Sequence, residues 1–290
     1  MSRAAKNRDT AAKVAVADRL TGRDAEMLRL LAEHRMLTSR QIARILFPRE
    51  RTARERIAAM RSFGLVETFR PPCSSGTSPL HCTLTPKALR LVVGDDEAAP
   101  SWRRVARAGT LGAVAMALRA DLAHLRGTNE VFSQLIAHAR NNPGCELEVW
   151  RSEWSCARLF GGQVRPDGFG RWRDGEAWCD FFLEYDTGTE TQERLLAKLV
   201  GYADLAFAAD VTCPVLFWLP SATREENLHR RLVEQRSEVP VATAYGDPTK
   251  SEPASAIWRL AGADMARLPL AVLGAASLRE KGGRQRPHAV

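Results

Sequence analysis

The sequence predicts a mixed α/β protein built from two domains. Its 290 residues are enough for two domains of ordinary size. Between residues 20 and 95, apolar residues recur at helical spacing in three segments, and two short strand patterns follow them. From residue 124 to residue 262, the patterns follow one another in the order α-β-β-β-α-β. This order predicts an α/β domain organised around a central sheet.

The composition is that of a globular protein with a basic balance of charge. Hydrophobic residues make up 45% and charged residues 26% of the chain. We expect no membrane span, because no run of about 20 apolar residues occurs, and no secretory signal, because the polar N-terminus lacks an apolar core. The six cysteines are scattered without a Cys-x-x-Cys pair, which favours reduced thiols and a cytoplasmic protein. The formal net charge of +8 favours a polyanionic partner.

The first domain, residues 20–95, begins with helical patterns. Thr21 is placed to cap a first helix, and Thr38 precedes a second, shorter one. A third helix is expected from about residue 49 to residue 63. Its apolar stripe has the spacing i, i+4, i+7 and consists of Ala53, Ile57 and Met60.

A hairpin and a further helix complete this domain. Strands are expected at 65–68 and 80–84, joined by a Pro- and Gly-rich loop, with a helix at 85–93. Three helices followed by a hairpin resemble the winged helix-turn-helix family, and the segment TSRQIARILFP…RTARERIAAMRSFGLVE…HCTLTPKAL carries the resemblance. It implies that the first domain binds DNA.

The charge distribution favours the same function. Seven arginines and two glutamates lie between residues 40 and 61, a local net charge of +5. On the third helix, arginines project away from the apolar stripe, as on a recognition helix that enters the major groove. The alternative is a solvated helix on a protein-binding winged helix. We expect double-stranded DNA as the partner, contacted by Arg40, Arg44, Arg49, Arg51, Arg54 and Arg61.

The remaining segments are predicted to be tails and a linker. Residues 1–19 are expected to be a disordered basic tail, and residues 263–290 a C-terminal tail. Residues 96–123 are predicted to be a helical linker. Its Ala-rich stretch 101–122 either connects the two domains or packs against a second subunit, so a homodimer is one expectation.

In the second domain, residues 124–262, the segment Asn142-Pro143-Gly144 is expected to end the first helix. The predicted elements, in order, are a helix at 129–140, strands at 146–152, 164–172 and 176–185, a helix at 190–207, a strand at 215–219, a helix at 225–236, and strands at 239–244 and 257–260.

The strand ending at Tyr185 carries the most informative residues. Side chains of a strand alternate between its faces, so Glu184 and Asp186 share a face with Phe182. A carboxylate at the end of a buried strand costs free energy unless another charge offsets it. A divalent cation held jointly with Asp167 would offset it, because hard cations such as Mg²⁺ take oxygen ligands. We therefore expect Asp167, Glu184 and Asp186 to converge on a site for Mg²⁺, with Mn²⁺ as a substitute.

This arrangement resembles the metal site of the PD-(D/E)XK nuclease superfamily, as does the order α-β-β-β-α-β. Pro166-Asp167 matches the first acid of the pattern and Glu184 the second. The resemblance implies a restriction-endonuclease-like α/β domain with Asp167, Glu184 and Asp186 in its active site. The chain departs from the pattern, which has a lysine where this sequence has Asp186. Lys198, one helical turn before Tyr202, could bring its ammonium into the site instead.

Each of these residues also has a structural explanation. Asp167 ahead of a glycine fits a turn. Glu184 fits an ion pair with an arginine. Asp186 fits the cap of the following turn, and Lys198 fits a surface lysine whose stem lies along apolar residues.

Both domains in this order, with FLEYDTGTE followed by KLVGY, resemble the replication-relaxation family of actinobacterial plasmids and mobile elements over about residues 21–260. That family implies a protein that acts on DNA. Two functions stay open. One is a Mg²⁺-dependent DNA endonuclease that nicks or cleaves, and the other is a non-catalytic DNA-binding regulator that keeps a nuclease fold.

Overall fold

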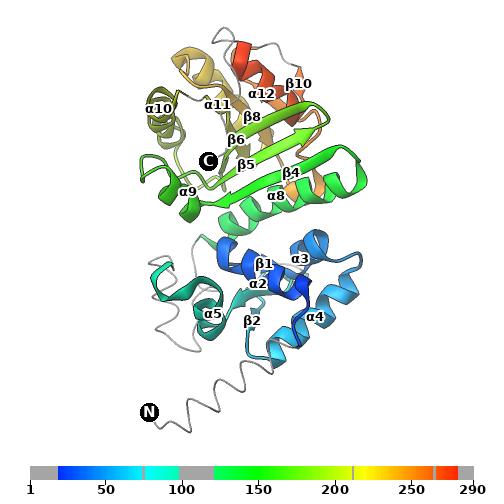
Figure 1. The fold of residues 1–290 in the computed structure, drawn as a ribbon. Helices are drawn as coiled ribbons and strands as arrows, with labels where there is room; N and C mark the ends of the chain where they lie inside the picture. Colours follow the sequence, from blue (N-terminus) through cyan, green and yellow to red (C-terminus); the bar gives the residue numbers. More distant parts are fainter. Residues whose placement is uncertain (1–18, 74–75, 98–120, 211, 264–265, 280–290) are drawn as a thin grey trace. The chain divides into compact units, whose positions relative to one another are not determined.

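The chain divides into two compact units, with the division between Leu122 and Ala123 (Figure 1). The computed structural model describes residues 19–73, 76–97, 121–210, 212–263 and 266–279. Each unit combines helices with a sheet, so the prediction of a mixed α/β protein is confirmed. Within the described residues, no helix combines the length and the apolar character that crossing a bilayer requires.

The first unit begins with the helices α2 (Gly22–His34), α3 (Ser39–Leu46) and α4 (Glu50–Ser62). Thr21 caps α2 and Thr38 caps α3, each in a capping box with the residue three positions further on. The buried stripe of α4 consists of the three residues predicted from their spacing, Ala53, Ile57 and Met60.

A small antiparallel sheet completes the first unit. Its strands are β1 (Leu37–Thr38), β2 (Val66–Phe69) and β3 (His81–Leu84), in the order β1-β3-β2. The helix α5 (Pro86–Glu97) follows and packs against α2. The hairpin of β2 and β3 forms where the strand patterns predicted it. Sequence analysis missed β1, because a strand of two residues has no periodicity to detect.

The second unit is organised around a seven-stranded mixed sheet in the order β10-β9-β8-β7-β6-β5-β4. Its strands are β4 (Cys145–Ser152), β5 (Gly168–Asp174), β6 (Ala177–Tyr185), β7 (Val215–Leu219), β8 (Val241–Tyr245), β9 (Trp258–Leu260) and β10 (Arg267–Leu268). The strands β6, β7 and β8 are parallel, and the other pairs are antiparallel. The carboxyl ends of β6, β7 and β8 therefore meet at one edge of the sheet.

Helices cover both faces of this sheet (Figure 1). Apolar residues of α8 (Leu122–Asn141) and α12 (Leu270–Arg279) pack on one face with Phe181 and Leu183. Those of α10 (Gln192–Ala209) and α11 (Ala222–Gln235) pack on the other face with Phe182. Neighbouring residues of β6 thus enter opposite cores, which is the alternation that the sequence predicted.

Three features of the second unit differ from the predictions. The helix α8 begins at Leu122 rather than at residue 129, and the short helix α9 (Glu153–Leu159) was not predicted. The prediction of a C-terminal tail from residue 263 is wrong for residues 267–279, which form β10 and α12. The helix α12 is stabilised by packing against β6, a tertiary contact that local pattern does not reveal. Residues 1–18 and 98–120, which include most of the predicted linker and homodimer contact, lie outside the described residues.

Candidate functional site

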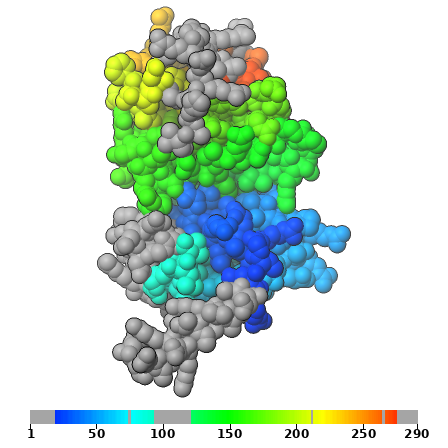
Figure 2. Space-filling view, in the orientation of Figure 1, coloured from blue at the N-terminus to red at the C-terminus, as the bar shows by residue number. Residues whose placement is uncertain are grey.

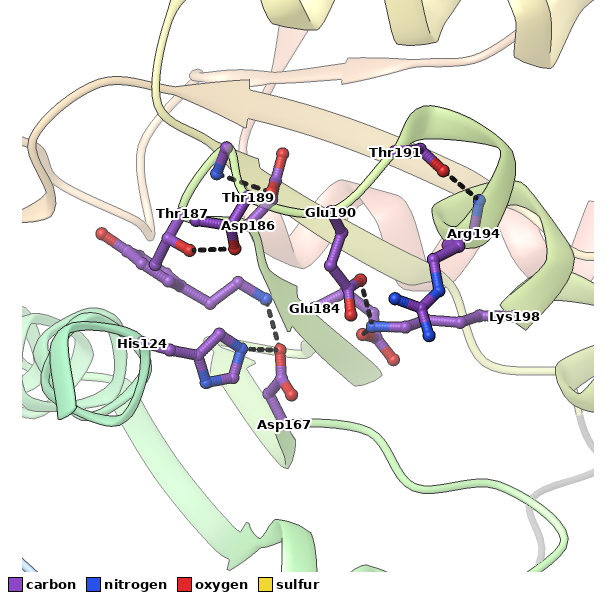
Figure 3. A network of polar contacts seen from close by, with 12 residues as sticks. His124, Asp167, Glu184, Asp186, Thr187, Thr189, Glu190, Thr191, Arg194 and Lys198 are labelled. Carbon is purple, nitrogen blue, oxygen red and sulfur yellow. Dashed lines mark hydrogen bonds and ion pairs between the residues drawn. The ribbon is translucent and has the colours of Figure 1, made fainter. Parts of the chain in front are cut away.

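The carboxyl end of β6 brings together three of the four predicted catalytic residues (Figure 3). Glu184 is the last but one residue of β6, and Asp167 immediately precedes β5, the antiparallel partner of β6. The register pairs Gly168 with Leu183, so Asp167 arrives beside Glu184. Lys198 reaches the same place from α10.

Asp167 is held by two hydrogen bonds on one of its oxygens. The backbone N–H of Tyr185 donates to Oδ2 over 2.7 Å, and His124 Nε2 lies 2.8 Å from the same oxygen. Asp167 Oδ1 accepts no hydrogen bond from the described residues. Asp167 therefore bridges α8 and β6 and keeps one carboxylate oxygen for another partner.

Glu184 is a deeply buried carboxylate, with 2% of its surface exposed. Lys198 Nζ donates to its Oε2 over 2.7 Å, and the Tyr202 hydroxyl donates to its Oε1. Burial, and after it the neighbouring charge of Asp167, raise the pKa of Glu184 to about 7. Two carboxylates with interacting charges thus lie at one end of β6. A lysine and a tyrosine of α10 both donate hydrogen bonds to one of them, Glu184.

The side chain of Lys198 points into this site (Figure 3). Its ammonium bonds Glu184 and also lies 3.3 Å from Glu190 Oε2, in the loop after β6. Burial acts to lower the pKa of Lys198, but the charge and hydrogen bond of Glu184, together with the charges of Asp167 and Glu190, raise the pKa above its ordinary value. The helix α10 thus places an ammonium group directly beside the buried carboxylate of Glu184.

The side chain of Asp186 pairs with residues other than those that contact Asp167 and Glu184. It accepts hydrogen bonds from the backbone N–H of Gly188 and from Arg224 of α11, in an ion pair that buries the carboxylate. Arg224 also donates to the carbonyl of Glu190. Asp186 thereby fastens the loop after β6 to α11, which agrees with the turn-capping alternative. Among the described residues, no three His, Cys, Asp or Glu side chains are grouped so as to hold one metal ion.

Three contacts of the site were not foreseen from the sequence, those of His124, Tyr202 and Arg224. Burial acts to lower the pKa of His124, while its hydrogen bond to Asp167 and the charge of that residue raise it overall. The signal available for Tyr202 is its position one helical turn after Lys198 in α10. His124 and Arg224 reach the site from separate helices, and local spacing carries no signal for such contacts.

A second candidate site is the surface of α3 and α4 in the first unit. Of the six predicted DNA-binding arginines, Arg44 is half-buried and the other five are exposed. Arg51 pairs with Glu55 and Arg54 with Glu50 along the exposed side of α4, and 90% of the Arg51 side chain is exposed. The light-blue surface of this segment projects from the first unit in Figure 2. Such exposed pairs contribute little to stability, so their guanidinium groups can take other partners at small cost.

Arg56, the seventh arginine of this segment, has a structural role. It donates from Nε and Nη2 to Asp24, whose side chain is fully buried and also completes the capping box of α2. Burial acts to raise the pKa of Asp24, and the hydrogen bonds of Arg56 and Thr21 lower it overall. This pair joins α2 to α4 and so fixes the orientation of the helix that carries the exposed arginines.

No curated protein and no solved structure matches the chain significantly. A family model described as replication-relaxation matches residues 28–216, which begins in α2 and ends in β7. The matched residues include the exposed arginines of α4 and the cluster of Asp167, Glu184 and Lys198. The chain therefore belongs to the replication-relaxation family.

Proposed function

We propose that the protein binds double-stranded DNA through α3 and α4, as part of plasmid or mobile-element replication or relaxation. Membership of the family suggests that role and implies an interaction with DNA. The observation that carries the proposal is the set of exposed arginines opposite the buried stripe of α4. Guanidinium groups bind phosphates in a fixed forked geometry, and arginine is the commonest side chain to contact guanine in the major groove.

The first unit supports this reading by its element order. The helices α2, α3 and α4 precede the hairpin of β2 and β3, as in a winged helix-turn-helix protein, where the third helix reads the major groove. In this interpretation α4 is the recognition helix and the hairpin is the wing. Arg56 is excluded from the DNA contact, because its guanidinium is engaged with Asp24.

The test is a DNA-binding titration of the full chain at several salt concentrations. Changing Arg51 and Arg54 together to Ala should weaken binding to duplex DNA and reduce the salt slope by about one to two released counterions. The matched control is Arg29→Ala, which removes an exposed arginine paired within α2. Binding and salt slope that stay at wild-type values in the double variant would exclude α4 from the interface.

A second candidate function is metal-dependent cleavage of a DNA phosphodiester, and the convergence of Asp167, Glu184 and Lys198 favours it. Mg²⁺ is held in many phosphoryl-transfer sites by one or two carboxylates together with substrate phosphate. Asp167 and Glu184 fit that requirement, since they are neighbouring carboxylates and Asp167 Oδ1 accepts no hydrogen bond from the described residues. Asp186 is not part of this donor set, because it is paired with Arg224.

In this candidate mechanism each residue has a distinct part. Asp167 and Glu184 would hold the cation, and the cation would supply Lewis-acid activation of water and of the phosphoryl oxygens. Lys198 would direct positive charge at the phosphate, where negative charge develops during cleavage. Tyr202 keeps Glu184 oriented through its hydroxyl. The N-terminal unit would supply affinity for DNA.

The nicking test uses supercoiled plasmid with Mg²⁺ or Mn²⁺, with a chelator as control. The endonuclease predicts open-circular or linear product that disappears with the chelator and in Glu184→Gln. A cation should also raise the melting temperature of the wild type and not that of Glu184→Gln. If calorimetry detects no cation binding with or without DNA, the nuclease candidate fails and the non-catalytic regulator remains.

A further inference from the structure

A charged pocket of about 600 Å³ lies in the second unit, away from Glu184, between the first turns of α11 and the strands β8, β9 and β10. Its lining includes three arginines, two glutamates and one tyrosine, namely Arg230, Arg259, Arg267, Glu225, Glu226 and Tyr245. The volume is within the range of ligand sites for small molecules and nucleotides.

The arginines of this pocket are arranged on adjacent strands. Arg259 of β9 is paired directly with Arg267 of β10, so both side chains leave the same face of the sheet. Like charges opposite each other on paired strands repel. Two residues of α11 offset this repulsion, since Glu226 pairs with Arg259 and the buried Glu225 pairs with Arg267. The guanidinium groups of Arg259 and Arg267 therefore line the pocket side by side, and each is held by a glutamate of α11.

A third guanidinium adds an excess of positive charge. Arg230 of α11 bonds the side-chain oxygen of Asn227 over 3.0 Å, and no carboxylate among the described residues forms an ion pair with it. The three arginines outnumber the two glutamates of the lining, so the pocket favours an anionic ligand. The N-terminal turn of α11 also lines it through Ala222 and Thr223, where the helix dipole favours negative charge.

An aromatic ring accompanies these charges. Tyr245, at the end of β8, is 43% exposed, and the Arg267 guanidinium lies 5.1 Å from its ring centroid. Exposed aromatic surface beside guanidinium groups is the combination by which proteins stack an unpaired base next to its phosphate.

This pocket shares an edge of the sheet with the carboxylate cluster. The strands β6 and β8 are both parallel to β7, so Glu184 and Tyr245 both lie at carboxyl ends of the parallel strands. Arg224 connects the two places, because it follows Thr223 in the first turn of α11 and bonds Asp186, two residues after Glu184. A strand of nucleic acid lying along this edge would pass both.

We propose that the pocket binds a single-stranded segment of DNA, with a phosphate at Arg230, Arg259 and Arg267 and the adjoining base on Tyr245. An unpaired base presents its flat face for stacking, whereas bases within a duplex are covered by their neighbours. The proposal rests on the proposed function only in taking DNA as the substrate, since its residues are separate from those of α4. It assigns the second unit a DNA contact of its own.

The test measures binding of a fluorescein-labelled oligothymidylate to the full chain by anisotropy. All variants carry Arg51→Ala and Arg54→Ala, which suppresses the contribution of α4. Adding Tyr245→Ala should weaken binding about 5- to 150-fold, the loss of one stacked base, whereas Tyr245→Phe should retain binding. Adding Arg230→Ala should lower the salt slope by about 0.7, the value for one phosphate of a single strand.

The matched control is Arg231→Ala on the same helix, whose guanidinium pairs with Glu193 outside the pocket and whose loss should leave binding unchanged. If folded Tyr245→Ala binds the oligonucleotide as tightly as its parent with Arg51→Ala and Arg54→Ala, the proposal is overturned. Displacement of the oligonucleotide by an equal concentration of thymidine monophosphate would also overturn it, because it would identify a free nucleotide as the ligand. Duplex binding, measured separately on the α4 variants, reports the proposed function, so each can fail without the other.

Discussion

Lys198 Nζ lies 2.7 Å from Glu184 Oε2 and thereby joins α10 to the carboxyl end of β6. The Glu184 side chain is buried and the Lys198 side chain is one third exposed, so the pair places a carboxylate charge in the interior, where Lys198 and Tyr202 bond it. Removing one member of such a pair is costly, because the remaining charge stays buried. The behaviour of the second unit with pH and with mutation follows from this relationship.

The free energy of unfolding should fall as the pH rises from about 4.5 to about 7. Burial and the charge of Asp167 raise the pKa of Glu184 from 4.5 to about 7, so the folded state keeps a proton that the unfolded state releases. The contribution is complete below the unfolded pKa and is lost as the pH rises through the folded one. The raised pKa of His124 acts in the same direction at higher pH. For Glu184 the change amounts to about 3 kcal/mol.

Urea denaturation of wild type and Glu184→Gln across this pH range, in chelator, isolates the effect. The unfolding free energy of the wild type minus that of Glu184→Gln should fall with rising pH, since the glutamine does not titrate. A difference that stays constant from pH 4.5 to pH 7.5 would mean that Glu184 keeps an ordinary pKa in the folded protein.

Replacing Lys198 by Met should destabilise the second unit by about 2 kcal/mol, below the range for fully buried pairs because the lysine is partly exposed. Adding Glu184→Gln should recover part of this loss, because the double variant has no unpaired charge left in the interior. The double-mutant cycle gives the coupling directly, and we expect at least about 1 kcal/mol. Additive single effects would show that the two groups do not interact in solution.

In the first unit, Arg56→Met should lower stability by about 3 kcal/mol, because it leaves the fully buried Asp24 carboxylate without its cation. The matched control is Arg54→Met, which removes an exposed partner of Glu50 and should cost less than about 0.5 kcal/mol. DNA binding should show the opposite pattern: Arg54→Met should weaken it, and folded Arg56→Met should retain it. If both variants lose the same amount of unfolding free energy, Arg56 does not have the structural role that we assign to it.

The sequence was informative wherever the relevant signal was periodic. The stripe of Ala53, Ile57 and Met60 and the alternation along β6 follow from helical and strand spacing, and both are present. The position of Asp167 beside Glu184 follows from the hairpin register of β5 and β6.

Contacts between elements distant in sequence could not be predicted in the same way. Arg224 meets Asp186 across 38 positions and His124 meets Asp167 across 43, and nothing in local spacing indicates either contact. The carboxylate of Asp186 was therefore assigned to a cation site, although a protein guanidinium accompanies it. The helix α12 was missed for a related reason, since its stability depends on packing against β6.

That packing requires glycine at position 274. A Cβ there would lie 2.1 Å from the carbonyl oxygen of Trp178, and a backbone atom inside a sheet cannot move aside easily. In α8, a Cβ on Gly127 would lie 2.1 Å from the ring of Tyr185, a side chain that can rotate at some cost. In α10, a Cβ on Gly201 would have its nearest neighbours at 3.4 Å, a distance that a small adjustment accommodates.

The effects of alanine at these three positions on the unfolding free energy should therefore follow a fixed order. We expect Gly274→Ala to destabilise the second unit by about 3 kcal/mol or more and Gly127→Ala by about 1 to 3 kcal/mol, because each forces atoms apart in a packed interior. Gly201→Ala should be neutral or stabilising by up to about 1 kcal/mol, because alanine favours the helical backbone. Urea denaturation of the three variants measures the order directly. If Gly274→Ala is as stable as Gly201→Ala, the close approach of α12 to β6 is wrong, and with it the assignment of Leu270, Ala271 and Leu273 to the packed core of this unit.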